Sequence, residues 1–159
     1  MKKRSFLSKL KEEGKLELVE PSDEIMGSYL EKSANSLKAS SILLESGLLE
    51  ESVSMAYYAM YHSLLALMFK CGIKCENHSG NILLLRGIFR EVKLYKMISY
   101  AKEESVDKQY YVDFVITKKD VEDLASTAQE FITGIKVLIE GLMTEGIREL
   151  RERFYKDEL

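Results

Sequence analysis

An uncharged segment in the middle of the chain, from Ser52 to Phe69, constrains the fold most. It contains no Asp, Glu, Lys or Arg, although charged residues make up 31% of the sequence. Apolar residues recur on one side of it at the i, i+3, i+4 spacing of a helix face, and a second set lies opposite. The first set comprises Val53, Ala56, Tyr57, Met60, Leu64, Leu67 and Met68, and the second comprises Tyr58, His62, Leu65 and Phe69. A helix that is apolar on all sides is normally buried on all sides, so we predict the central helix of a bundle, or one that also forms an oligomer interface.

A membrane span is the alternative interpretation of this segment, because about 20 apolar residues cross a bilayer. The segment carries serines, tyrosines and a histidine, and charges of both signs are spread over the rest of the chain. Polar side chains at this density are costly in hydrocarbon. We therefore expect no membrane contact.

Length and composition point to one helical domain. The chain has 159 residues, one proline and no tryptophan, and its abundant Lys, Glu, Leu and Ala favour helices. A formal net charge of -3 provides no global cationic field, so nucleic-acid binding would need a local patch. The two cysteines, Cys71 and Cys75, do not make a secreted disulfide framework.

The two ends of the chain bear on its location. The basic N-terminus has no hydrophobic run of a signal peptide. The C-terminal residues Lys156, Asp157, Glu158 and Leu159 spell an endoplasmic-reticulum retention signal, which is read only in proteins that enter that compartment. We interpret the match as chance and expect a cytoplasmic protein.

Local signals divide the chain into three parts. Residues 1–21 are predicted to form a charged N-terminal arm with a short helix near Leu7, residues 22–142 a helical bundle, and residues 143–159 an amphipathic helical extension. Within the bundle, Ser22 is a candidate N-cap for a helix that ends at Gly47.

Further helices are predicted in the rest of the bundle. One starts at Asn77 or Ser79, a weaker one covers residues 94–104, and a long one follows the capping box formed by Thr117 and Asp120. Residues 73–77 are predicted to be a polar loop and residues 105–117 an ordered loop. We predict no β-strand.

Titratable chemistry centres on the two histidines, His62 and His78. With an unperturbed pKa near 6.5, either could transfer protons at neutral pH. If both faced one cleft, they could cleave RNA without a metal, one removing the 2′-hydroxyl proton and one protonating the leaving oxygen. The structural alternative is that His62 is a core histidine and His78 helps cap a helix.

Cys71, Cys75 and His78 are spaced like part of a metal site. A structural zinc ion needs four tetrahedral ligands, and His62 would lie about 13 Å from Cys71 along the same helix. We therefore predict no metal. The sequence also contains no GxxxxGK[ST], GxGxxG or GxSxG motif, and we predict no cofactor.

Two short motifs resemble the HEPN domain family. Residues 56–62 read AYYAMYH, and residues 78–80 read HSG after the glycine at 72. They are most similar to the family's small prokaryotic branch, which has an AYYAMFH central helix. Residues 110–114, YYVDF, are similar to the ADYGDF region of that branch, and the likeness covers about residues 25–142.

The resemblance implies a compact antiparallel helical bundle, commonly a homodimer, that is linked to nucleotides or RNA. Many members of the family are encoded beside a minimal nucleotidyltransferase as a toxin–antitoxin pair. Catalytic members are metal-independent endoribonucleases with an Arg-x4-6-His motif assembled across the dimer. This chain lacks that motif, since the nearest arginine upstream of either histidine is Arg4.

We therefore predict an all-α, antiparallel up-and-down bundle of HEPN type that partners a minimal nucleotidyltransferase and has little or no catalysis of its own. An endoribonuclease toxin that uses His62 and His78, and a purely structural dimeric adaptor, are the alternatives. The expected site is a nucleotide- or RNA-facing cleft lined by Tyr58, Tyr61, His62, His78, Tyr111 and Asp113.

Overall fold

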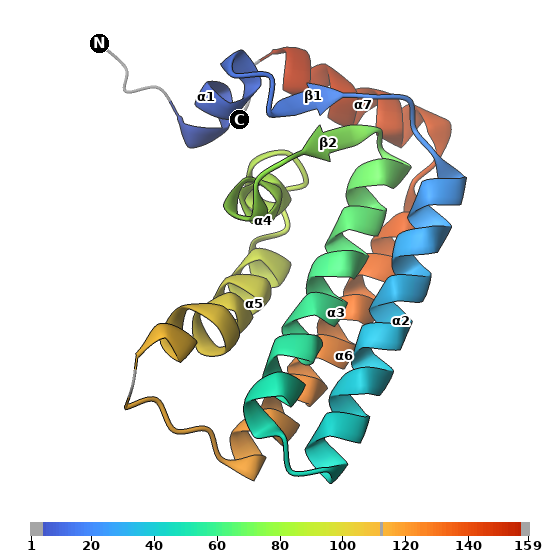
Figure 1. The fold of residues 1–159 in the computed structure, drawn as a ribbon. Coiled ribbons are helices and arrows are strands. Elements are labelled where there is room, and N and C mark those ends of the chain that lie inside the picture. Colours follow the sequence, from blue (N-terminus) through green and yellow to red (C-terminus); the bar gives the residue numbers. More distant parts are fainter. Residues whose placement is uncertain (1–4, 112, 157–159) are drawn as a thin grey trace.

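The computed structural model describes residues 5–111 and 113–156, which form the predicted all-α, up-and-down bundle (Figure 1). The bundle helices are α2 (Asp23–Glu45), α3 (Leu49–Lys70), α5 (Val92–Lys102) and α6 (Lys118–Gly141). The smaller elements are α1 (Phe6–Glu12), β1 (Leu16–Leu18), β2 (Ile73–Cys75), α4 (His78–Gly87), the π-helix η1 (Glu103–Asp107), the 3₁₀-helix η2 (Lys108–Tyr110) and α7 (Thr144–Tyr155). Within the described residues, every helix is too short or too polar to cross a bilayer.

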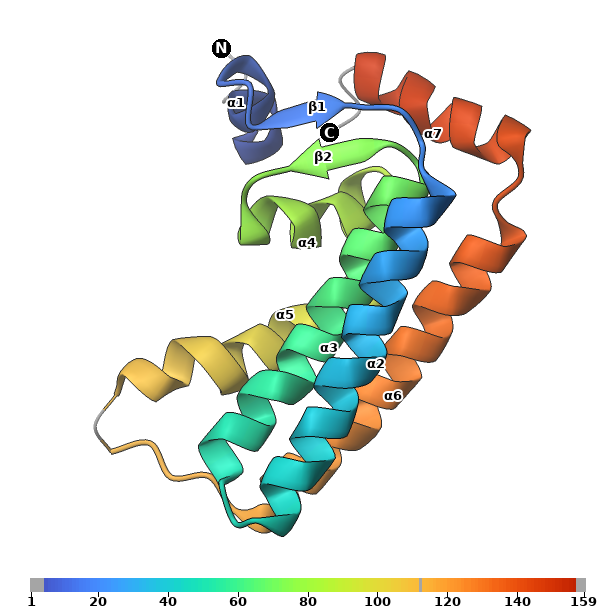
Figure 2. The same cartoon turned by 45° about the vertical axis from the view of Figure 1, so that its right-hand side comes forward.

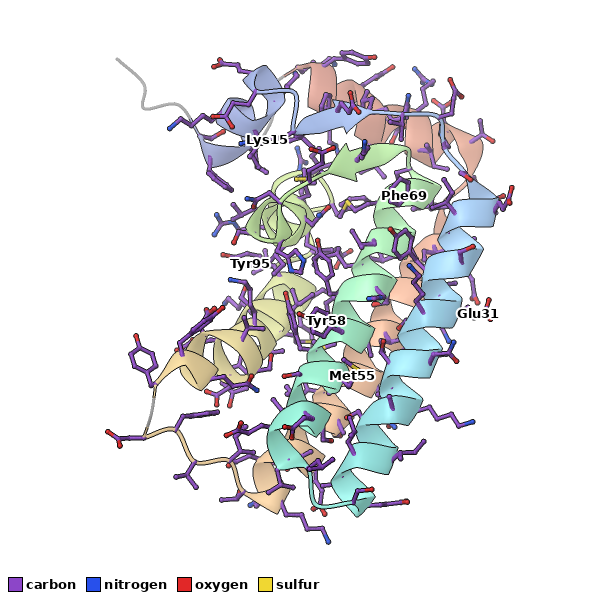
Figure 3. The ribbon with its side chains drawn as sticks, in the orientation of Figure 1. Lys15, Glu31, Met55, Tyr58, Phe69 and Tyr95 are labelled. Carbon is purple, nitrogen blue, oxygen red and sulfur yellow. The ribbon has the colours of Figure 1, made fainter. Side chains whose placement is uncertain are left out.

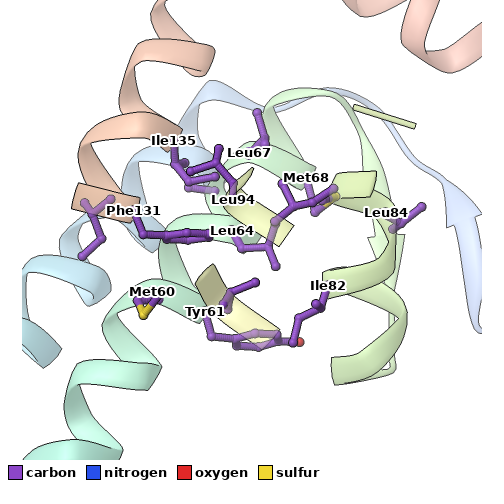
Figure 4. Close-up of a cluster of buried hydrophobic side chains, with 14 of the residues drawn as sticks. Met60, Tyr61, Leu64, Leu67, Met68, Ile82, Leu84, Leu94, Phe131 and Ile135 are labelled. Atoms are coloured by element: carbon purple, nitrogen blue, oxygen red, sulfur yellow. The ribbon is translucent and has the colours of Figure 1, made fainter. Parts of the chain in front are cut away.

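Helix α3 is the centre of the bundle, with α2 and α6 packed along it (Figure 1). Figure 4 shows Leu64 and Leu67 of α3 meeting Phe131 of α6 and Leu94 of α5. All four side chains are buried, and burial of each such side chain contributes about 1.5–3 kcal/mol to folding. The first apolar set predicted for this segment therefore forms the core.

The second apolar set of α3 is not fully buried within this chain, and the alternative of an oligomer interface on that side of the helix stays a prediction. Tyr58 is 36% exposed, and His62, Leu65 and Phe69 are half-buried. Figure 3 shows Tyr58 and Phe69 on the side of α3 that lies between α2 and α5, where Phe69 stacks on Tyr29 of α2 and the cover is only partial. One flank of the central helix thus faces the surface.

Three predicted helix starts are confirmed by their capping hydrogen bonds. The Ser22 hydroxyl accepts from the Ile25 backbone N–H at 3.1 Å, and Thr117 and Asp120 form a reciprocal capping box. Asn77, rather than Ser79, caps α4. These caps satisfy backbone donors that the first turn of a helix leaves unpaired.

The predicted polar loop at residues 73–77 is wrong, because Ile73–Cys75 forms strand β2, paired antiparallel with β1. Leu18 is opposite Ile73, and Leu16 is opposite Cys75. Strands of three residues are too short to show an alternating pattern. The predicted loop at 105–117 likewise begins with the helical turns η1 and η2.

The segments outside the bundle gather at one of its ends, where α1, the two strands and α7 lie together (Figure 2). Leu7 and Leu10 of α1 and Leu150 and Phe154 of α7 are buried there. The described parts of the predicted arm and extension therefore contribute to the core. Residues 157–159 of the retention-like tetrapeptide lie outside the described residues.

Candidate functional site

The structure brings four of the predicted site residues together beside the open flank of α3. His78, the first residue of α4, stacks on Tyr61 of α3, with ring centroids 3.9 Å apart and planes 14° apart. Tyr58 meets His62 edge-on with centroids 6.2 Å apart, and Tyr29 of α2 does the same at 6.2 Å. We call Tyr29, Tyr58, Tyr61, His62 and His78 the tyrosine–histidine face.

The arrangement follows partly from local geometry and partly from tertiary contacts. Tyr58 and His62 are four residues apart on α3 and therefore lie on the same side of the helix. His78 reaches Tyr61 only because β2 and the Asn77 cap turn the chain back beside α3. This second contact has no local sequence signal.

Asn81 fixes the position of the Tyr61 ring, and sequence analysis missed it. Its side chain is fully buried, and Nδ2 donates to the Tyr61 hydroxyl and to the Cys75 carbonyl, both at 3.0 Å, and to the Asn77 carbonyl at 3.2 Å. It thereby joins α3, β2 and the start of α4. The available signal was a single amide directly before the apolar run that begins at Ile82.

Burial and positive charge act together on the two histidines. Burial is the main cause that lowers the pKa of His62, and the charge of Lys32, together with that of His78 when His78 is protonated, lowers it further. One face of His78 is covered by Tyr61, and this partial burial, followed by the charge of Lys102, lowers the pKa of His78. Both imidazoles are therefore neutral at pH 7.

The electrostatics of the tyrosine–histidine face favour an anion. The charged groups that shift the two histidine pKa values are cationic, and none is a carboxylate. Nδ1 of His62 is buried and has no hydrogen-bond partner among the described residues. Burial also raises the pKa of Tyr61 to about 12, so its hydroxyl remains protonated. Neutral imidazoles beside cations and aromatic rings can bind a phosphate and a planar group, and one imidazole can accept a proton.

A polar cleft of about 360 Å³ adjoins the tyrosine–histidine face at Tyr58. It is lined by Ser54, Tyr58, Ser105, Val106, Gln109 and Tyr110. Gln109 Nε2 donates to the Ser54 hydroxyl at 3.1 Å and to the Glu50 carbonyl at 3.2 Å, which anchors η2 to α3. Sequence analysis missed Ser54 and Gln109, although Gln109 directly precedes the paired tyrosines.

The structure does not bring Tyr111 and Asp113 to the histidines. Both are exposed in the loop between η2 and α6, and Tyr111 is 72% exposed. Tyr110, the last residue of η2, lines the cleft instead. Tyr110 is itself 85% exposed, so it gives only part of its side chain to the cleft.

Cys71 is a buried free thiol and Cys75 a half-buried one. Burial raises the pKa of Cys71 to about 12 and also raises the pKa of Cys75, so neither is a thiolate at pH 7. Within residues 5–111 and 113–156, no three His, Cys, Asp or Glu side chains are close enough to hold a metal ion.

Comparison with known proteins places the bundle in a described group. A sequence profile of the HEPN domain matches residues 26–138, which include the whole tyrosine–histidine face. The protein named "Putative toxin MJ0605" from Methanocaldococcus jannaschii is 24% identical over 125 residues, or 76% of this chain and 92% of that protein. The protein named "UPF0332 protein PH1297" from Pyrococcus horikoshii is 46% identical over 46 residues, which cover 29% of this chain and 32% of that protein.

Proposed function

Because the chain belongs to the HEPN domain family, we propose that it acts as one half of a toxin–antitoxin-like pair and binds a nucleotide or RNA on the tyrosine–histidine face. The observation that carries the proposal is the contact of two imidazoles with tyrosine rings, with Lys32 and Lys102 close enough to lower the imidazole pKa values. The name of the Methanocaldococcus relative supports the toxin–antitoxin part. The phosphate would lie near the imidazoles, and Tyr58 offers a ring on which a base can stack.

A minimal nucleotidyltransferase is the proposed partner, and a homodimer the proposed assembly. The open flank of α3 supports a protein contact, because Leu65 and Phe69 are half-buried there and Phe69 stacks on Tyr29 with centroids 5.5 Å apart. An apolar strip of this kind gains stability when a second surface covers it. In a homodimer built on this strip, the two tyrosine–histidine faces would lie close together.

An endoribonuclease is the second candidate, favoured by one observation. Protonation of His78 would lower the pKa of His62, so the two imidazoles lie within electrostatic reach of each other. Acid–base cleavage needs one of them protonated, whereas burial and lysine charge keep both neutral at pH 7. We therefore prefer nucleotide or RNA binding to RNA cleavage as the proposed function.

The substitution Lys32→Glu is expected to weaken the binding of a short fluorescent RNA about tenfold, because it replaces a cation near His62 with an anion. The matched control is Lys38→Glu, an exposed position on the same helix. Fluorescence anisotropy at fixed salt measures both dissociation constants. Equal weakening by Lys32→Glu and Lys38→Glu, or no binding by the unmodified protein, would contradict the proposal.

The same RNA distinguishes a binder from a nuclease. Incubation in the presence of a chelator should leave it intact. Cleavage that disappears in both His62→Ala and His78→Ala would support the endoribonuclease instead. Co-purification with a co-expressed minimal nucleotidyltransferase tests the partner, and its absence would remove that part of the proposal.

A further inference from the structure

The end of the bundle opposite α7 carries two hollows that the proposed function does not use. The α2–α3 turn and the α5–α6 loop meet at this end (Figure 1), residues of the loop line both hollows, and residues of the turn line one of them. Residues 114–116 of that loop separate them, since Phe114 and Ile116 line both. We call this region the acidic end.

The first hollow has an apolar floor and an acidic rim. Val53 of α3, Leu124 of α6 and Phe114 of the loop provide apolar surface. Tyr100, which is 57% exposed, also lines it. Glu104, Asp120 and Asp123 are the charged residues that line it.

The second hollow repeats this chemistry. It is formed by residues 47–51 and by residues 114–116. Leu48 and Val115 expose 47% and 78% of their surfaces, and Glu50 and Glu51 supply negative charge. Among the described residues that line the two hollows, none is Lys, Arg or His.

An apolar floor under a ring of carboxylates matches the side chains of lysine and arginine. Their aliphatic stems cover apolar surface, and their charged heads reach acidic groups at the rim. An arginine head also gains from the face of a neighbouring tyrosine ring. The acidic groups are not spaced for a metal ion, because no metal-binding cluster occurs within residues 5–111 and 113–156.

We propose that the acidic end docks a basic, amphipathic segment of a partner protein. One Lys or Arg side chain of that segment enters the first hollow, with its stem against Val53 and Leu124 and its head toward Asp123. An apolar residue of the same segment covers Leu48 and Val115 at the second hollow. Charge complementarity selects this occupant, since five carboxylates and no basic group line the two hollows.

The acidic end and the tyrosine–histidine face carry opposite charges and would take different ligands. Lys32 and Lys102 act on the histidines, whereas carboxylates line the hollows. A basic partner is therefore drawn to one site and an anion to the other. Failure of RNA binding would leave the docking proposal intact. Failure of peptide docking would likewise leave the RNA-binding proposal intact.

The test uses the full chain with ¹³C-labelled methyl groups and a short synthetic peptide of alternating leucine and arginine. The peptide should shift the NMR signals of Val53, Ile116 and Leu124, which line the hollows. The double variant Glu51→Lys, Asp123→Lys should weaken binding about tenfold, because it places cations in both hollows.

The matched control for charge is Glu140→Lys, an exposed position at the other end of α6, which should leave peptide affinity unchanged. Circular dichroism confirms that each variant is folded. Three results would overturn the proposal: methyl shifts that fall outside the two hollows, equal weakening by Glu140→Lys, or binding of spermidine as tight as that of the peptide.

Discussion

Replacing Asn81 with alanine is expected to lower the free energy of unfolding by about 3 kcal/mol. The side chain is fully buried and donates to three acceptors on separate elements. Its removal takes the donor from the Tyr61 hydroxyl and the Cys75 carbonyl and leaves a cavity among Asn81's former neighbours. A buried polar group that loses its partner costs about 1–3 kcal/mol.

Urea unfolding followed by far-ultraviolet circular dichroism measures this change. Asn81→Asp should be at least as damaging, because it replaces the amide donor with an acceptor that faces two carbonyl oxygens. Ser79→Ala, an exposed change in the same turn of α4, is the matched control and should cost less than about 0.5 kcal/mol. An Asn81→Ala protein as stable as the control would show that Asn81 does not hold these elements together.

Replacing Gly72 with alanine should cost about 4 kcal/mol, the other large effect that we expect. Gly72 has φ +69°, which L side chains rarely adopt, and an added Cβ would lie 2.8 Å from the Pro21 nitrogen and closer still to the Val19 carbonyl oxygen and to Arg151 Nη1. The Gly72 carbonyl accepts from the Val19 backbone N–H at 2.8 Å and from Arg151 at 2.9 Å. The substitution would therefore separate β1 and α7 from the end of α3.

Gly47→Ala provides a matched control for Gly72. Gly47 has φ +78°, but a Cβ there meets nothing within 4 Å. Only the backbone strain of about 1 kcal/mol should appear, so the difference between the two variants isolates the cost of the contacts. Equal destabilisation in chemical denaturation would mean that α7 and β1 are not held at Gly72.

Local sequence patterns predicted much of the bundle but not its capped end. The capping side chains of Ser22, Asn77 and Thr117 act within three residues along the chain, so their signals are visible in the sequence. Arg151 Nη1, by contrast, donates to the Val19 carbonyl at 2.8 Å, although the two residues are 132 positions apart in the sequence. In the sequence Arg151 alternates with glutamates, which is typical of an exposed helix.

The candidate site was predictable to a similar degree. The pair Tyr58 and His62 follows from helix geometry, whereas the stacking of His78 on Tyr61 depends on the tertiary path through β2. Asn81 and Gln109 escaped notice because single amides carry no periodic signal. The positions of the predicted residues Tyr111 and Asp113 depend on the irregular loop, which no pattern specifies.

The central claim is that the tyrosine–histidine face holds two imidazoles that are neutral in the free protein and become protonated when an anion binds beside them. Histidine-resolved NMR titration tests it most directly, with and without a ribonucleoside monophosphate, and with the parent nucleoside as control. We expect His62 and His78 to titrate below pH 6.5 in the free protein, since burial and Lys32 or Lys102 lower both pKa values.

The phosphate should raise both pKa values, because it stabilises each imidazolium, and by linkage the nucleotide should bind more tightly as the pH falls from 7.5 to 6. The nucleoside should leave both pKa values where they were. Histidines that titrate at or above pH 6.5 in the free protein, or that do not respond to the phosphate, would contradict the account.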